Sequence, residues 1–432
     1  MNYQTQFSEK VNLNHLTDNP LDRASGKVKD ILNGDFCIDV HAHLFDIKCI
    51  NKSYFIIRML KDLVGLKSGS ETYSDLSIEQ AYNEIDENDE NWEDELEEKL
   101  RENPALMQTQ NTKGIIDIYK ARKFLGFKTM EEVYDYYLEN FSLSKVTENK
   151  KVIVTALMMD LETGWNVKLK KSLYDQIIEL KALRDKHPVL PFFVCDPRRA
   201  DLESDKENLY SLFNLAFSKD SPFFGVKIYP ALGYDPSDYR LWPIYEVCEK
   251  YKIPVLSHCG GESITTDITN DLVIYEGDKK VSHSKKNRTE VGYSLNDPKR
   301  WTLVLEKFPK LKLNLAHFGG YETWSKPSKV THNGQARKET IFDFMEKYEN
   351  VFADFSYNLI ETDLSKSLRE VLTAEKKIRE RTLFGTDYWV VSKEGDLLKE
   401  QREFLTIMDD NFSALKLSEL LTVDNPKKYL FG

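Results

Sequence analysis

The sequence lacks the patterns that mark several common classes of protein. Its five cysteines are scattered without CxxC spacing, which favours reduced thiols in a cytosolic protein. No apolar run approaches membrane-spanning length, and Met1–Lys10 is polar with no apolar signal segment. Neither a GxGxxG fingerprint nor a P-loop is present to support a nucleotide-binding open sheet. We therefore expect a soluble protein of the cytoplasm.

An excess of negative charge limits the partners further. The chain has 60 basic and 71 acidic residues and a net charge of -11. That balance argues against nucleic acid or an anionic membrane as the main partner, so we expect a small-molecule substrate. Part of the excess lies in Glu84–Glu102, which is most simply the solvated face of a helix. No interface pattern is legible, which leaves open whether the chain forms a homo-oligomer.

After residue 150, the sequence alternates regularly between strand and helix patterns. Short β-branched or aliphatic runs alternate with amphipathic helical patterns, which is typical of βα units. We predict strands at Val152–Met158, Leu190–Cys195, Gly225–Tyr229, Val255–His258, Leu311–His317, Val351–Phe355 and Thr382–Thr386. An earlier strand at residues 37–45 brings the set to the eight that a (β/α)8 TIM barrel of the α/β class needs. A doubly wound open sheet is the alternative.

Residues 50–150 interrupt this pattern after the first strand. Their apolar residues recur three and four apart in the pieces Tyr54–Val64, Ser77–Ile85, Trp92–Leu100 and Met130–Phe141. We predict that this segment is a helical insertion within a single domain that spans residues 1–432.

The first strand carries two histidines. His41 and His43 are two residues apart, so in an extended strand their side chains point the same way and can bind one ion. The same alternation predicts that Cys37 and Asp39 share the face of the histidines. Ile38, Val40, Ala42 and Leu44 would then form the apolar opposite face. An isolated pair of this kind carries little weight without the rest of the chain.

Later strands also end in residues that suit a metal. His258, His317 and Asp387 each stand at the end of a predicted strand, and Lys227 lies inside an otherwise apolar one. A barrel places the carboxyl ends of its strands in one ring, so these side chains would converge although they are far apart in sequence. Three imidazoles and one carboxylate suit Zn²⁺, with Mn²⁺ or Fe²⁺ as alternatives.

In this order the motifs resemble those of the amidohydrolase superfamily. Phrases such as Val226-Lys227-Ile228-Tyr229-Pro230, Leu315-Ala316-His317-Phe318-Gly319-Gly320 and Gly385-Thr386-Asp387 resemble its amidohydrolase-2 branch of TIM-barrel metal-dependent hydrolases. The resemblance implies a distorted barrel and a metal-bound water as nucleophile. It also implies an activity, because members of the superfamily hydrolyse amides and lactones, and this branch includes decarboxylases and hydratases.

The resemblance also implies a ligand set. His41, His43 and Asp387 would bind the more buried ion, and His258 would join them if there is one ion. With two ions, His258 and His317 would bind the second, and a carbamate formed on Lys227 would bridge them. That reaction needs a neutral amine, which burial favours by lowering the lysine pKa. We favour one ion, with His317 then left as a catalytic group.

We therefore predict a metal-dependent hydrolase of a carbon–nitrogen bond or of a lactone or ester bond. Asp387 would accept the proton of the attacking water and pass it to the leaving group, and His317 would polarise the substrate carbonyl. The alternative activity is that of a non-oxidative decarboxylase or hydratase. A different class, a non-catalytic ligand-binding barrel, is less favoured because every ligand position holds a competent residue.

Three further residues are candidates for binding substrate. Arg198 follows the third strand and could hold a substrate carboxylate, although pairing with Asp196 explains it as well. Tyr229 and Trp389 follow strand ends and could line a pocket. The long loop 260–297 is polar and basic, which hints at an anionic substrate, but a solvated loop explains this composition about as well.

Overall fold

A computed structural model describes residues 10–50, 126–140, 150–261, 264–285, 287–325, 336–356, 362–388, 397–411 and 413–432. Eight parallel strands form one sheet in the order β1-β2-β3-β4-β5-β8-β9-β10. The strands are β1 Phe36–Ala42, β2 Lys151–Leu157, β3 Val189–Val194, β4 Gly225–Ile228, β5 Val255–Ser257, β8 Leu313–Leu315, β9 Val351–Asp354 and β10 Thr382–Leu383. All eight predicted strands are confirmed, each within a few residues of its predicted ends.

The sheet closes on itself between β1 and the residues that follow β10. Val40 N–H donates to Phe384 O over 3.2 Å, and Asp387 N–H donates to His41 O over 2.7 Å. One step further, His43 N–H donates to Tyr388 O over 2.8 Å. Closure removes the free edges that an open sheet would expose, and it confirms the predicted barrel.

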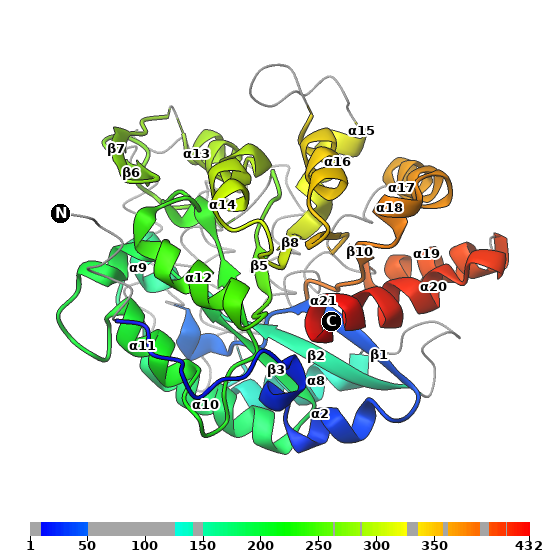
Figure 1. The fold of residues 1–432 in the computed structure, drawn as a ribbon, viewed down its shortest axis with the longest axis horizontal. Helices are drawn as coiled ribbons and strands as arrows, with labels where there is room; N and C mark the ends of the chain where they lie inside the picture. Colours follow the sequence, from blue (N-terminus) through cyan, green and yellow to red (C-terminus); the bar gives the residue numbers. More distant parts are fainter. Residues whose placement is uncertain are drawn as a thin grey trace, which may run out of the picture.

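Helices lie around the strands (Figure 1). Between successive barrel strands and after β10, the helices are α8 Met130–Asn140, α9 Leu161–Trp165, α10 Leu173–Lys186, α11 Leu209–Ala216, α12 Trp242–Lys250, α13 Arg288–Leu295, α14 Thr302–Lys307, α15 Glu322–Ser325, α16 Arg337–Lys347, α17 Thr362–Ala374, α18 Lys376–Arg379, α19 Leu397–Asn411, α20 Leu417–Glu419 and α21 Asn425–Phe431. Before the first strand comes α2 Gly26–Ile31, which begins where the Ser25 hydroxyl accepts from Val28 N–H.

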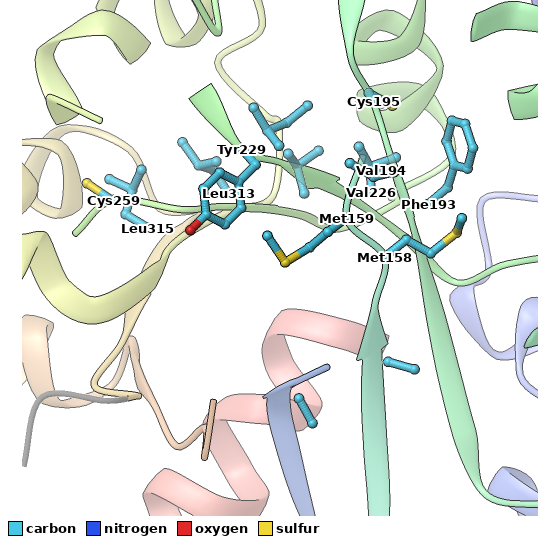
Figure 2. Close-up of a cluster of buried hydrophobic side chains, with 14 of the residues drawn as sticks. Met158, Met159, Phe193, Val194, Cys195, Val226, Tyr229, Cys259, Leu313 and Leu315 are labelled. Atoms are coloured by element: carbon cyan, nitrogen blue, oxygen red, sulfur yellow. The ribbon is translucent and has the colours of Figure 1, made fainter. Parts of the chain in front are cut away.

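Two apolar clusters fill the barrel and its surroundings. The inner cluster draws side chains from strands all around the barrel and is closed by Tyr429 and Leu430 of α21; its strand members include Ile38, Val40, Ile153, Leu190, Phe192, Leu256, Phe352 and Leu383. The outer cluster contains both strand and helix side chains, for example Val226 of β4, Ile177 of α10 and Ile244 of α12. Figure 2 shows part of this outer cluster, with Val194, Val226, Tyr229, Leu313 and Leu315 among its labelled side chains.

A register shift in β1 corrects one prediction. Asp39 pairs with Val154 but Ala42 pairs with Ala156, so β1 uses three residues where β2 uses two. The shift turns His41 inward even though Val40, its neighbour, also belongs to the inner cluster. Asp39 lies on the outside instead, where it accepts a hydrogen bond from a helix side chain. The prediction that Cys37 and Asp39 share the face of the histidines is therefore wrong. The prediction that Ile38 and Val40 lie on the opposite face is also wrong, since both belong to the inner cluster. Ala42 and Leu44 lie opposite the histidines as predicted.

The loop 260–297 contains structure that the sequence reading missed. Strands β6 Val273–Glu276 and β7 Lys279–Ser282 form an antiparallel hairpin, and α13 follows it. The turn is two residues long, and Gly277 begins it with a φ of 63°. Glycine adopts this left-handed conformation without the steric cost that a Cβ brings. The hairpin packs Leu272, Ile274 and Val281 against α13 in a small cluster of its own.

The predicted insertion is only partly within the described residues. Its last predicted helix is confirmed as α8, but the pieces at 54–64, 77–85 and 92–100 lie outside. The single domain over residues 1–432 therefore stays a prediction. Among the described residues, no helix is both long and apolar enough to cross a membrane.

The barrel interior leaves no room for a side chain on Gly225. A Cβ there would clash with the buried ring of Phe192, so Gly225→Ala should lower the free energy of unfolding by about 1–3 kcal/mol. Gly26→Ala is the control, because nothing lies within 4 Å of a Cβ at that helical position. It should be neutral or stabilise by up to about 1 kcal/mol. Urea unfolding measures both, and equal effects would contradict this packing.

Candidate metal centre

The structure brings the six predicted metal-site residues to one end of the barrel, and all six are buried. His41 ends β1, and His43 follows two residues later. His258 follows β5, His317 follows β8, Asp387 follows β10, and Lys227 lies within β4. Hydrogen bonds, ring contacts or electrostatic interactions connect each of them to at least one of the others. These ends carry the sites of TIM-barrel enzymes.

Asp387 is at the centre of the group. Its Oδ1 lies 3.3 Å from His41 Nε2 and 3.4 Å from His43 Nε2. His317 approaches from the other side, and its ring centroid is 4.9 Å from that of His41. Among the residues that the structure describes, His41, His317 and Asp387 are the trio whose ligand-type atoms all lie within 4.8 Å of one another.

The outer nitrogens of the two β1 histidines fix which ring atoms carry hydrogen. His43 Nδ1 lies 3.2 Å from the carbonyl oxygen of Leu157, and His41 Nδ1 lies 3.3 Å from the Asp354 carboxylate. Both oxygens can only accept, so each Nδ1 donates in the neutral ring and each Nε2 keeps its lone pair. Two electron-rich Nε2 atoms therefore face Asp387 Oδ1, at 3.3 and 3.4 Å.

Protons cannot easily neutralise this group near pH 7. Burial lowers the pKa of His41 to about 3, with the charge of Lys227 acting in the same direction. Burial likewise lowers the pKa of His43. For Asp387, burial alone would raise the pKa, but the histidines, His41 first, lower it to about 2. The imidazoles are thus neutral and the carboxylate charged, a donor set that suits a divalent cation.

His258 and His317 form a second pair. His317 Nδ1 lies 2.9 Å from the carbonyl oxygen of Ser356 and must donate to it, so its Nε2 accepts from His258 Nδ1 over 3.0 Å. This leaves His258 Nε2 with a lone pair, buried and without a hydrogen-bond partner in the described part of the chain. Tyr229 stacks on the His258 ring at 4.3 Å between centroids and so holds its orientation.

Asp354 and Ser356 support the site, although the sequence reading did not single them out. Asp354 accepts from His317 N–H over 3.2 Å and from Asn314 Nδ2 over 2.8 Å, in addition to His41 Nδ1. Ser356 Oγ lies 3.1 Å from both His41 Nδ1 and His317 Nδ1. Such outer partners orient metal-ligating histidines. The sequence does contain a signal for them: Asp354 and Ser356 are polar residues two apart at the end of a barrel strand, the same pattern that identified His41 and His43.

Backbone strain is concentrated at the same place. His317, Phe318 and Asp387 have φ values of 59°, 46° and 55°, in the left-handed region that side chains disfavour. Each such residue costs about 1–3 kcal/mol, and strain of this kind gathers at functional sites. Hydrogen bonds from His317 N–H to Asp354 and from Asp387 N–H to His41 O hold two of the three residues in place. Gly385 allows its segment to lie close to β1, because a Cβ on this residue would lie only 2.6 Å from the Cβ of His41.

Lys227 is fully buried, and its Nζ has no hydrogen-bond partner in the described residues. Burial lowers its pKa to about 8, which brings a neutral amine within reach of ordinary pH. The Tyr229 ring lies below the amine, with 5.4 Å between Nζ and the ring centroid. The buried position is the one that the sequence predicts.

The structure describes two of the three predicted substrate-binding residues, and their contacts differ. Asp196 holds Arg198 through Nε at 2.9 Å and Nη2 at 2.6 Å, so a substrate carboxylate would have to compete with this pair. The Tyr229 hydroxyl accepts from Ile264 N–H over 3.2 Å, which ties the loop 260–297 to the end of β4. Trp389 lies outside the described residues.

A closed α/β barrel with buried histidines and a carboxylate at its carboxyl end defines a class of metal-dependent enzymes. The Amidohydro_2 family model, described as Amidohydrolase, matches residues 174–428. The chain therefore belongs to the amidohydrolase family, which makes it a member of an enzyme superfamily.

Several solved structures are similar to the chain at low identity. One is 5-carboxyvanillate decarboxylase LigW2 from Novosphingobium aromaticivorans with bound manganese, at 12% identity, a TM-score of 0.49, and coverage of 94% of this chain and 99% of that one. Another is 4-oxalomesaconate hydratase LigJ from Rhodopseudomonas palustris, at 12% identity, a TM-score of 0.43, and coverage of 91% and 95%. An amidohydrolase from Burkholderia multivorans with bound zinc has 9% identity, a TM-score of 0.43, and coverage of 72% and 92%. No curated protein matches the sequence.

The neutral histidines predict a pH dependence for the metal-free protein. His41 keeps a pKa of about 3 when folded against 6.5 when unfolded, so between these values the unfolded chain binds more protons. Stability should therefore fall as the pH drops from 7 to 5, with a slope that approaches about 1.4 kcal/mol per pH unit below pH 6.5 for each histidine kept neutral. Asp39 has the opposite effect on stability, because burial raises its pKa to about 6. Below that pH the folded protein binds up to one more proton at Asp39 than the unfolded chain does.

Urea unfolding in EDTA at several pH values measures the slope. His41→Gln removes one of the neutral histidines and should flatten the slope relative to the wild type. A wild-type protein whose stability does not change between pH 7 and pH 5 would contradict the assignment of neutral rings.

Proposed function

We propose that the protein is a metal-dependent hydrolase that cleaves a carbon–nitrogen, lactone or ester bond of a small molecule. The observation that carries the proposal is the approach of His41 Nε2 and His43 Nε2 to Asp387 Oδ1, at 3.3 and 3.4 Å. Lone pairs on three buried atoms repel one another unless a cation lies among them. Family membership supports the enzymatic part of the proposal.

In this proposal His41, His43 and Asp387 hold one divalent ion, and His258 joins them, with His317 left as a catalytic group. Zn²⁺ is our first choice, because imidazole and carboxylate donors suit it, and Mn²⁺ or Fe²⁺ would also fit. A two-ion site would need Lys227 as a carbamate. The buried, unpartnered amine supports that alternative, so the number of ions is best measured directly.

The residues have separate roles in hydrolysis. A divalent ion held there supplies Lewis acidity and makes water a nucleophile near neutral pH. Asp387 accepts the proton of the attacking water and returns it to the leaving group. His317 would steady the negative charge that develops on the substrate carbonyl with a hydrogen on Nε2, which requires the tautomer in which Nδ1 accepts from the Ser356 hydroxyl, 3.1 Å away. In a decarboxylase the same groups would protonate a carbon.

The surroundings suggest where the substrate binds and where the protein works. The Tyr229 ring, stacked on His258, forms one wall beside the site, and Trp389 and Arg198 stay our further candidates for binding substrate. The pairing of Arg198 with Asp196 makes an anionic substrate a weaker part of the proposal. All five cysteines are buried free thiols, which supports a location in the reducing cytoplasm.

Metal analysis tests the site. The protein purified without chelator should hold close to one equivalent of ion per chain, or two if Lys227 is carboxylated. His41→Gln should lose most of it, because the removed nitrogen is one of the three facing atoms. His187→Gln is the control, since this histidine is half-buried on the surface and contacts Glu131. A wild-type chain without stoichiometric metal would favour the non-catalytic barrel.

Turnover tests the roles. A screen of small amides, lactones and esters should reveal hydrolysis, and release of CO2 from carboxylic acids in the same screen would establish the decarboxylase instead. Asp387→Asn should lower kcat by about 100-fold or more, because it removes the proton acceptor. Unchanged urea unfolding would show that the fold survives. An Asp387→Asn protein that keeps wild-type turnover would contradict the assigned role.

A further inference from the structure

The outward carboxylate of Asp39 receives four hydrogen bonds behind the site. Its Oδ1 accepts from His41 N–H and from Thr386 N–H, each over 3.0 Å. Its Oδ2 accepts from Thr386 Oγ1 over 2.6 Å and from the Tyr137 hydroxyl over 2.9 Å. Asp39 is fully buried, so these four donors replace the water that a carboxylate would otherwise bind.

Three of these four donors, His41 N–H and both the N–H and the Oγ1 of Thr386, belong to the segments that carry two of the proposed ligands. His41 is itself one of them, and Thr386 directly precedes Asp387. The Asp39 carboxylate therefore ties the end of β1 to the residues after β10 at the point where the barrel closes. A charge-assisted bond to a backbone N–H is stronger than a neutral one, so this tie limits how far the two segments can separate.

The fourth donor comes from α8, in the segment that separates β1 from β2. Tyr137 is fully buried, and its ring also lies edge-on against that of Tyr388, with 4.9 Å between centroids. The helix is anchored independently, since Met130 N–H donates to Glu179 of α10 over 2.8 Å. Tyr137 thus reaches the neighbours of both His41 and Asp387 from a fixed helix.

We propose that Tyr137 and Asp39 form a positioning unit that sets the separation of His41 and Asp387 and thereby the affinity of the site for its divalent ion. This inference rests on the proposed metal site. Neither residue touches the ion or the substrate: Asp39 lies outside the barrel wall and acts through backbone N–H groups. The insertion would then contribute to the metal centre through one hydroxyl, which no motif in the sequence reports.

The test compares two tyrosines on the same helix. Tyr137→Phe removes the hydroxyl that binds Asp39, and Tyr134→Phe is the matched control, because Tyr134 is also buried but packs against His187. Co²⁺ binding is followed by its visible absorption spectrum, and Zn²⁺ affinity by competition. Tyr137→Phe should raise both dissociation constants by about 10-fold or more, as loss of an outer partner does, and should change the Co²⁺ spectrum. Tyr134→Phe should match the wild type.

A second pair of variants guards against a Tyr137→Phe protein that does not fold. Thr386→Val removes another donor to Asp39, whereas Thr386→Ser keeps the hydroxyl and should restore wild-type Co²⁺ binding. Equal Co²⁺ affinities and spectra for wild type and Tyr137→Phe, or for the Val and Ser variants, would overturn the positioning unit alone. A wild-type protein that binds no Co²⁺ would overturn the metal site and this proposal with it.

Discussion

The approach of two buried imidazole nitrogens to one buried carboxylate oxygen is the constraint on which the site depends. His41 Nε2, His43 Nε2 and Asp387 Oδ1 can stay this close only because other contacts occupy the remaining polar atoms of both rings. Leu157 O and Asp354 fix the Nδ1 hydrogens, and burial keeps the rings neutral. An arrangement that is unfavourable alone becomes favourable when a cation completes it, which is the usual logic of a preformed metal site.

The barrel supplies this arrangement through its closure. The bonds that join β1 to the chain after β10 run through His41 and His43 themselves, so the same contacts complete the sheet and place the ligands. The extra residue in β1 turns His41 inward, and left-handed backbone at His317 and Asp387 aims two more side chains at the site. The left-handed residues lower the stability of the fold locally while they position the side chains of the site, as is common at functional sites.

Much of this could be predicted from the sequence because it depends on local periodicity. Each strand of the barrel carries an apolar run, and each candidate ligand stands where such a run ends. The side of Asp39 could not be predicted, because strict alternation along β1 fails at a bulge that pairing with β2 creates. The hairpin at 273–282 was missed because its two strands are only four residues long each and lie within a loop that is polar as a whole.

The residues that orient the proposed ligands could not be predicted from local sequence patterns either. Asp354 and Ser356 act on His41 across more than 300 positions of chain, and Tyr137 acts through Asp39 across 98. Such partners depend on how the strands close and on where an insertion helix docks. The identity of the substrate is harder still to predict from the sequence, since it depends on loops that differ among barrels of one architecture.

Anomalous diffraction from crystals soaked in Zn²⁺ or Mn²⁺ tests the central claim most directly. The account predicts a strong anomalous peak at the carboxyl end of the barrel, about 2.0–2.2 Å from His41 Nε2 and from an oxygen of Asp387. Density that instead shows His41 hydrogen-bonded directly to Asp387, with no peak between them at saturating metal, would contradict it.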